Sequence, residues 1–148
     1  MTLQQFQAAL AAGKGTPTPK FFVIDVAMPG SGTNSGLLQN QKITSDSAQA
    51  WFVLQRLMTD QSAGSFRFQI YPDGGQAGYS STGIGGAANN RIRNECLFGT
   101  GSLPFIIGVP MIYPPQGNIV FDIQNLSASP VTAHLVFAGF LFLPDGTS

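Results

Sequence analysis

The chain is 148 residues long and carries seven basic and seven acidic side chains, so its formal net charge is zero and only 9% of its residues are charged. This length allows one domain with a sizeable hydrophobic core. The charge balance argues against nucleic-acid binding, which needs a basic surface, and it favours self-association, because proteins near zero net charge repel one another weakly.

Residues 1–19 are predicted to form an N-terminal arm. Leu3, Phe6 and Leu10 recur at helical spacing, which predicts a short amphipathic helix over residues 2–12, and the glycines and prolines of GKGTPTPK then end it. The segment lacks the basic start and continuous apolar run of a secretory signal, so we expect folding in a cytoplasm. The arm either caps the fold or tethers the chain to a partner, and the sequence leaves both possibilities open.

Residues 20–148 are predicted to form one β-sandwich domain. The expected strands are FFVIDVAMP, LLQNQKIT, AWFVLQRLM, FRFQIY, RIRNECLF, LPFIIGVPMIYPP, NIVFDIQN and VTAHLVFAGFLFL. Turn residues separate these strands roughly every ten positions, and no further helix is predicted. We therefore expect an all-β fold, namely an antiparallel, jelly-roll-like β-sandwich of about seven or eight strands.

Two strands carry more specific signals. The four prolines of residues 103–115 predict an edge strand or a bent strand, because proline cannot donate to a β-ladder. In FRFQIY the apolar side chains alternate with polar ones, and NIVFDIQN shows a similar pattern, so one face of each is expected to be buried. The predicted core positions in these strands are Phe66, Phe68, Ile70, Phe121 and Ile123.

A glycine-rich segment spans residues 72–90 and contains almost no large apolar side chain. Such a segment cannot offset its own ordering entropy, so a mobile loop is predicted. Within it, Gly83–Ala88 matches the G-x-G-x-x-A dinucleotide fingerprint. That fingerprint works only between a strand and the N-terminus of a helix, so the match does not indicate a nucleotide site.

The C-terminal segment Asn118–Pro144 contains one acidic residue, one histidine and no lysine or arginine. Its continuous apolar part is about a dozen residues, too short for a membrane-spanning helix of roughly 20. Polar residues and Pro130 divide it into two β-rich halves, which predicts a β-hairpin. In the second half, large apolar side chains occur at both odd and even positions, which point to opposite faces of a strand. One of these two faces must be covered by the arm, another subunit or another protein surface.

Candidate catalytic residues are few. His134 is the single histidine and its neighbours are apolar, so no nucleophile–histidine pair and no metal or cofactor site is predicted. Asp25 and Asp122 lie mid-strand; paired carboxylates can hydrolyse a glycosidic bond, but a solvent-facing position or an ion pair with Arg56, Arg67, Arg91 or Arg93 is favoured. Cys96 is alone and is expected to be a small buried thiol.

The order of the strands and the residue types within them resemble those of small β-sandwich virion proteins of tailed bacteriophages. The likeness covers about residues 20–144 and is carried most clearly by the proline-flanked strand Leu103 to Pro115, the turn at Gly117 and Asn118, and a final strand with Gly139 near its end. Within that class the chain looks most like jelly-roll cement, or decoration, proteins. The resemblance implies a non-enzymatic homo-oligomer, a dimer or larger, that binds the major capsid protein on the capsid surface of the virion.

The predicted interface combines apolar residues of the arm with one parity of the last strand: Leu3, Phe6, Leu10, Val136, Phe140 and Phe142. No cofactor, nucleic acid or membrane partner is expected. The alternatives are a neck, adaptor or fibre-associated virion protein, a carbohydrate- or receptor-binding module and, last, a glycan hydrolase. Twelve phenylalanines against one tryptophan count against sugar binding, because sugar-binding surfaces favour aromatic rings with a polar group.

Overall fold

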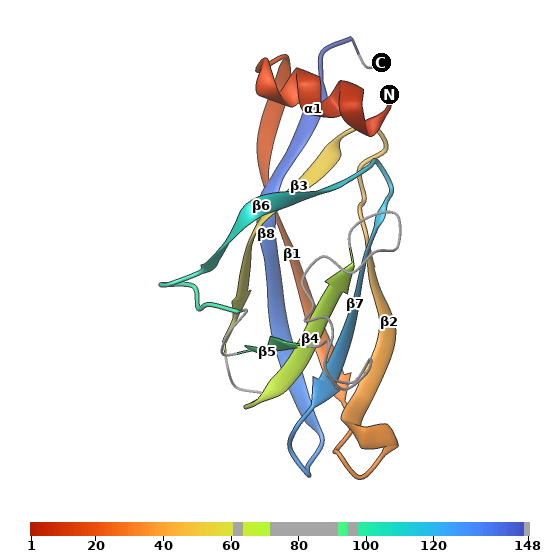
Figure 1. Ribbon diagram of the computed structural model, residues 1–148, viewed down its shortest axis with the longest axis vertical. Helices are drawn as coiled ribbons and strands as arrows, with labels where there is room; N and C mark the ends of the chain where they lie inside the picture. Colours follow the sequence, from red (N-terminus) through yellow and green to blue (C-terminus); the bar gives the residue numbers. More distant parts are fainter. Residues whose placement is uncertain (61–63, 72–91, 95–97, 147–148) are drawn as a thin grey trace.

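The computed structural model describes residues 1–60, 64–71, 92–94 and 98–146. In these residues two antiparallel four-stranded sheets pack face to face, and one short helix lies at the end of the sandwich where both chain termini are found (Figure 1). The predicted all-β antiparallel sandwich is confirmed. The strand arrangement is that of a jelly roll, in which consecutive strands lie in opposite sheets, except for the fourth and fifth strands, which are neighbours in the second sheet.

The predicted helix is present as α1 (Leu3–Ala11). It begins with a capping box: the Gln5 backbone N–H donates to the Thr2 hydroxyl, and the Gln5 side chain accepts from the Thr2 backbone N–H. These two bonds satisfy backbone donors that a helix start otherwise leaves unpaired. The helix ends before Gly13, whose φ of 66° is readily adopted only by glycine.

The first sheet contains β1 (Gly15–Met28), β8 (Val131–Pro144), β3 (Trp51–Thr59) and β6 (Phe105–Tyr113). β1 pairs with β8 over its whole length, so the strand begins five residues earlier than the predicted domain start at residue 20. Pro17 and Pro19 fit this strand because β1 is an edge, where a missing N–H costs no ladder bond.

The second sheet contains β2 (Leu37–Thr44), β7 (Asn118–Asn125), β4 (Phe66–Tyr71) and β5 (Ile92–Arg93), and the short helix η1 (Asn34–Gly36) precedes β2. Of the strand predicted over residues 91–98, the structure describes only β5 as strand. The predicted mobile loop at 72–90, with its fingerprint match, and Cys96 lie outside the described residues.

The predicted C-terminal β-hairpin is wrong. β7 pairs with β2 and β4 in one sheet, whereas β8 pairs with β1 and β3 in the other, so residues 126–130 cross between the sheets. The Asn125 side chain holds this crossing: its amide donates to the carbonyls of Pro29 and Ser129, and its oxygen accepts from the Ser127 N–H. An Asn/Ser/Pro break indicates a turn, but it does not determine which strands pair.

The core lies between the sheets and contains every predicted core residue in fully buried form: Phe66, Phe68, Ile70, Phe121 and Ile123. Phe68 is at the centre of an aromatic group, with ring centroids 4.8 Å from Phe98 and 5.2 Å from Phe121. Offset-stacked and edge-to-face rings at such distances add to the stability gained from burial. The alternation of apolar and polar residues in β4 and β7 therefore located the core correctly.

The predictions for the proline-rich strand are also confirmed, because β6 is an edge strand and is bent. Its pairing with β3 moves from Leu54↔Met111 to Arg56↔Ile106, so four residues of β6 lie opposite one residue of β3. β3 bulges against β8 at the same place. A Cβ on Gly139 of β8 would lie 1.8 Å from the Val53 carbonyl oxygen, so this close approach of two backbones requires glycine.

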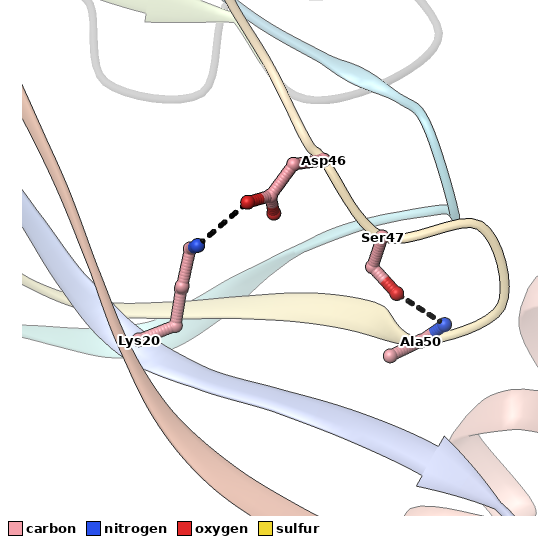
Figure 2. Close-up of polar contacts among 4 residues, drawn as sticks. All are labelled: Lys20, Asp46, Ser47 and Ala50. Atoms are coloured by element: carbon pink, nitrogen blue, oxygen red, sulfur yellow. Dashed lines mark hydrogen bonds and ion pairs between the residues drawn. The ribbon is translucent and has the colours of Figure 1, made fainter.

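A salt bridge joins β1 to the connection between β2 and β3 (Figure 2). Lys20 Nζ lies 3.0 Å from Asp46 Oδ2 and also sits over the Phe22 ring. The bond from Lys20 lowers the pKa of the Asp46 carboxyl. One residue further on, the Ser47 hydroxyl accepts from the Ala50 N–H and shapes the chain just before β3.

Candidate functional site

The outer face of the sheet β1-β8-β3-β6 displays its side chains in rows that run across the strands, because paired residues point to the same side. Starting from the α1 end, the rows are Pro17, Phe142 and Trp51; Pro19, Phe140, Val53 and Ile112; Phe21, Ala138, Arg56 and Ile106; Val23, Val136 and Met58; and Asp25 and His134. The first four rows are almost entirely apolar. Their β8 members belong to the second apolar face that the sequence predicts for this strand.

Helix α1 covers the two rows nearest to it, which we call the helix-covered half (Trp51, Val53, Ile112, Phe140 and Phe142). Phe6 is fully buried there, stacked on Trp51 at 4.6 Å between ring centroids and edge-on to Phe142 at 5.7 Å. Leu10 packs against the same cluster. In this structure the arm therefore caps its own domain, which is one of the two possibilities left open by the sequence.

The remaining rows form the open half (Phe21, Val23, Arg56, Met58, Ile106 and Val136). Phe21 is 52% exposed, and Val23 and Ile106 are each 69% exposed. Val136 and Met58 are half-buried between them. Three large apolar side chains exposed to this extent on one continuous sheet surface mark a candidate contact site, because the largest apolar patch on a protein is often functional.

The predicted interface residues fall on both halves. Phe6 and Phe142 are buried within the chain, and Leu10 and Phe140 are half-buried around them, so these four are not available to a partner while α1 is docked. Leu3 is exposed on the helix, and Val136 lies in the open half. Phe21, Val23 and Ile106 were not among the predicted interface residues. The signal for the first two was present, because FFVIDV has apolar residues on both faces of its strand, as β8 does.

Charged groups border the open half at opposite corners. At the end far from α1, Asp25 Oδ1 lies 2.5 Å from His134 Nδ1, and both side chains are exposed. The hydrogen bond to Asp25 raises the pKa of His134, and the charges of Asp25 and Asp60 act in the same direction. At the opposite corner Arg56 is half-buried between Ala138 and Ile106, and no ion pair joins it to another described residue.

The two mid-strand aspartates do not form a pair. Asp25 faces outward from the first sheet and contacts His134, as expected for a solvent-facing carboxylate. Asp122 lies on the outer side of the second sheet, where it is buried and accepts from the Asn40 N–H at 2.9 Å and the Tyr71 hydroxyl at 2.8 Å. The two carboxylates are on opposite faces of the sandwich, so they do not flank a common cleft as a glycosidase requires.

A pocket of about 270 Å³ lies beside the start of α1 and is lined by Met1, Ala48, Gln49, Trp51, Pro114 and Pro115. None of these side chains is acidic, basic or histidine, so the pocket offers no side-chain acid or base. Within the described part of the chain, no group of three or more potential metal ligands is found. The described helices are all too short or too polar to cross a membrane.

Comparison with models of protein families, with curated proteins and with solved structures finds no significant match to this chain. The fold and the surface just described are therefore the observations on which a function can be argued.

Proposed function

We propose that the protein is a non-enzymatic virion structural protein that binds and stabilises the assembled capsid of a tailed bacteriophage, as a cement or decoration protein. The observation that carries the proposal is the open half, an exposed and largely apolar sheet surface on a chain with no net charge. Such a surface is suited to contact with another protein, because burying exposed apolar side chains is the main favourable term in association.

The fold supports the same class of function. Eight-stranded jelly rolls built from two four-stranded sheets occur in viral capsid proteins and in lectins. Fold alone does not determine function, so the choice between these classes depends on the surface. Trp51 is stacked beneath Phe6 and the Tyr113 ring is fully buried, so neither ring can stack on a sugar. Among the described residues, the exposed large apolar side chains are aliphatic or methionine, apart from Phe21, which favours a protein partner.

The mechanism would be mass action. A subunit that binds only the assembled shell, and not free capsid protein, lowers the free energy of the assembled state. The decrease grows with the logarithm of the free subunit concentration divided by its dissociation constant for the shell. The low charge of the chain would make this binding insensitive to salt, because few ion pairs are available to be screened. The partners proposed are the major capsid protein and further copies of the chain itself, on the outer surface of the virion.

The test is co-sedimentation with shells assembled from the major capsid protein of the same genome. We expect the protein to sediment with shells, to raise their melting temperature and to ignore unassembled capsid protein. Val23→Lys should abolish binding by placing a charge in the open half, whereas Gln39→Lys, on an exposed position of the second sheet, should not. Equal binding by both variants, or none by the native protein, would contradict the proposal; labelling at the neck or fibre would favour that alternative position.

A further inference from the structure

We propose that the open half is a self-complementary surface on which a second copy of the same chain docks face to face, with Asp25 of each copy opposite Arg56 of the other. This inference rests on the proposed role in assembly. It assigns the open half to contact between copies of the subunit, so that Val23→Lys would disturb shell binding by disrupting that contact.

The first support is shape. The open half belongs to a continuous sheet whose apolar side chains stand in regular rows, and the flat partner that matches this spacing is another sheet face. Two sheets that pack through such faces lie about 10 Å apart, with their side chains interdigitating. Phe21 and Val23 of β1 and Ile106 of β6 are exposed enough to enter such a layer.

The second support is the distribution of charge. Asp25 lies on β1 at one corner of the open half, Arg56 lies on β3 at the diagonally opposite corner, and Val136 on β8 is midway between them in both directions. A two-fold axis that lies between two such faces and passes over Val136 exchanges the two corners. Each copy then sets its acidic corner against the basic corner of the other, which is the self-complementarity that an isologous dimer requires.

The third support is the state of Arg56 within the single chain. Arg56 is a half-buried residue beside Ala138 and Ile106, and among the described residues no salt bridge or hydrogen bond satisfies its guanidinium. Asp25 and Arg56 are separated by one intervening strand and two rows, on the order of 16 Å, so they cannot pair within one copy. A second copy brings a carboxylate to this guanidinium without any rearrangement of the fold.

The size of the surface sets the strength of the contact. The three rows that begin at Phe21, Val23 and Asp25 hold nine positions on two to four strands and cover on the order of 300 Å² per copy, less than half of the roughly 800 Å² per partner that a stable complex buries. We therefore expect a weak dimer, detected at high protein concentration. In an assembly that already holds copies close together, the same contact would be strengthened by the high local concentration.

The test is a charge exchange followed by analytical ultracentrifugation. Asp25→Arg and Arg56→Asp should each weaken self-association about tenfold or more, because each creates two like-charged contacts. Mixing the two single variants should restore it, since every interfacial pair in the mixed dimer is then of opposite charge. The chain that carries both substitutions should also associate, because the charges are merely exchanged.

The controls separate this inference from its alternatives. Lys42→Asp changes an exposed charge on the second sheet and should leave association unchanged. Circular dichroism melting checks that each variant folds, and restoration in the mixture itself requires two folded chains. Failure of the mixture to associate, or wild-type association by the single variants, would overturn the docking geometry. The ultracentrifugation experiment contains no capsid, so it tests the dimer independently of shell binding. If pairing is restored but the protein does not sediment with shells, the proposed function is rejected and the dimer stands. If the protein sediments with shells but pairing is not restored, the dimer is rejected and the proposed function stands.

Discussion

The two halves of one sheet face differ in what covers them. In the helix-covered half, Phe6 of α1 buries Trp51 and Phe142, and the apolar rows become a second small core. In the open half, Phe21, Val23 and Ile106 continue the same rows without any cover from the described chain. The difference shows that the chain itself covers only one part of its apolar outer face, and we propose that another molecule covers the rest.

Removing the cover gives the largest expected effect. Deleting residues 1–12 leaves β1 whole but exposes Trp51, Val53 and Phe142, so the apolar rows of both halves become exposed. We expect the shortened chain to aggregate at concentrations at which the full chain is soluble, because contiguous apolar surface of this size promotes association. Light scattering during concentration measures this. A shortened chain as soluble and as thermally stable as the full one would show that α1 is not a cap.

A single substitution sharpens the same comparison. Phe6→Ala should lower the free energy of unfolding by about 3 kcal/mol, at the low end for a buried phenylalanine because the helix can shift toward the space. Phe21→Ala, at a half-exposed position in the open half, should change it by less than about 0.5 kcal/mol. Urea unfolding of the two variants gives both values. Similar losses would mean that the two halves are equally buried.

The extent to which these features were predictable differs between elements. The strands and the core residues of β4 and β7 follow from alternation of apolar and polar residues, which is a local property. The hairpin prediction failed because pairing is non-local: β7 and β8 each have their partners far away in the sequence, and Asn125 stabilises a crossing that looks like a turn.

The candidate surface was predicted only in part for a related reason. The large apolar residues on the outward-facing positions of β8 indicated that something covers the outer face. A local pattern does not show which rows helix α1 reaches. Phe140 and Phe142 proved to lie under or beside the helix, whereas Val136 remains in the open half. Phe21 and Val23 had the same two-faced pattern, and only the register of β1 with β8 places them beside Val136.

The smallest expected effect is a pH dependence at the border of the open half. The pKa of His134 lies above its ordinary value of 6.5, chiefly through the hydrogen bond to Asp25. The stabilising contribution of the pair is therefore complete below about pH 6.5 and is lost as the pH rises through the folded-state pKa. In Asp25→Asn, NMR titration of the imidazole should show the pKa moving back down. An unchanged titration would mean that Asp25 does not hold the histidine.

The central claim is that a partner covers the open half and not the helix-covered half. The most direct measurement is an NMR spectrum of the isotope-labelled protein recorded as its concentration is raised. The account predicts that signals from Phe21, Val23, Val136 and Ile106 shift progressively, while those from Phe6, Trp51 and Phe142 stay in place. Shifts confined to the helix-covered half, or none at any concentration together with no binding to shells, would contradict it.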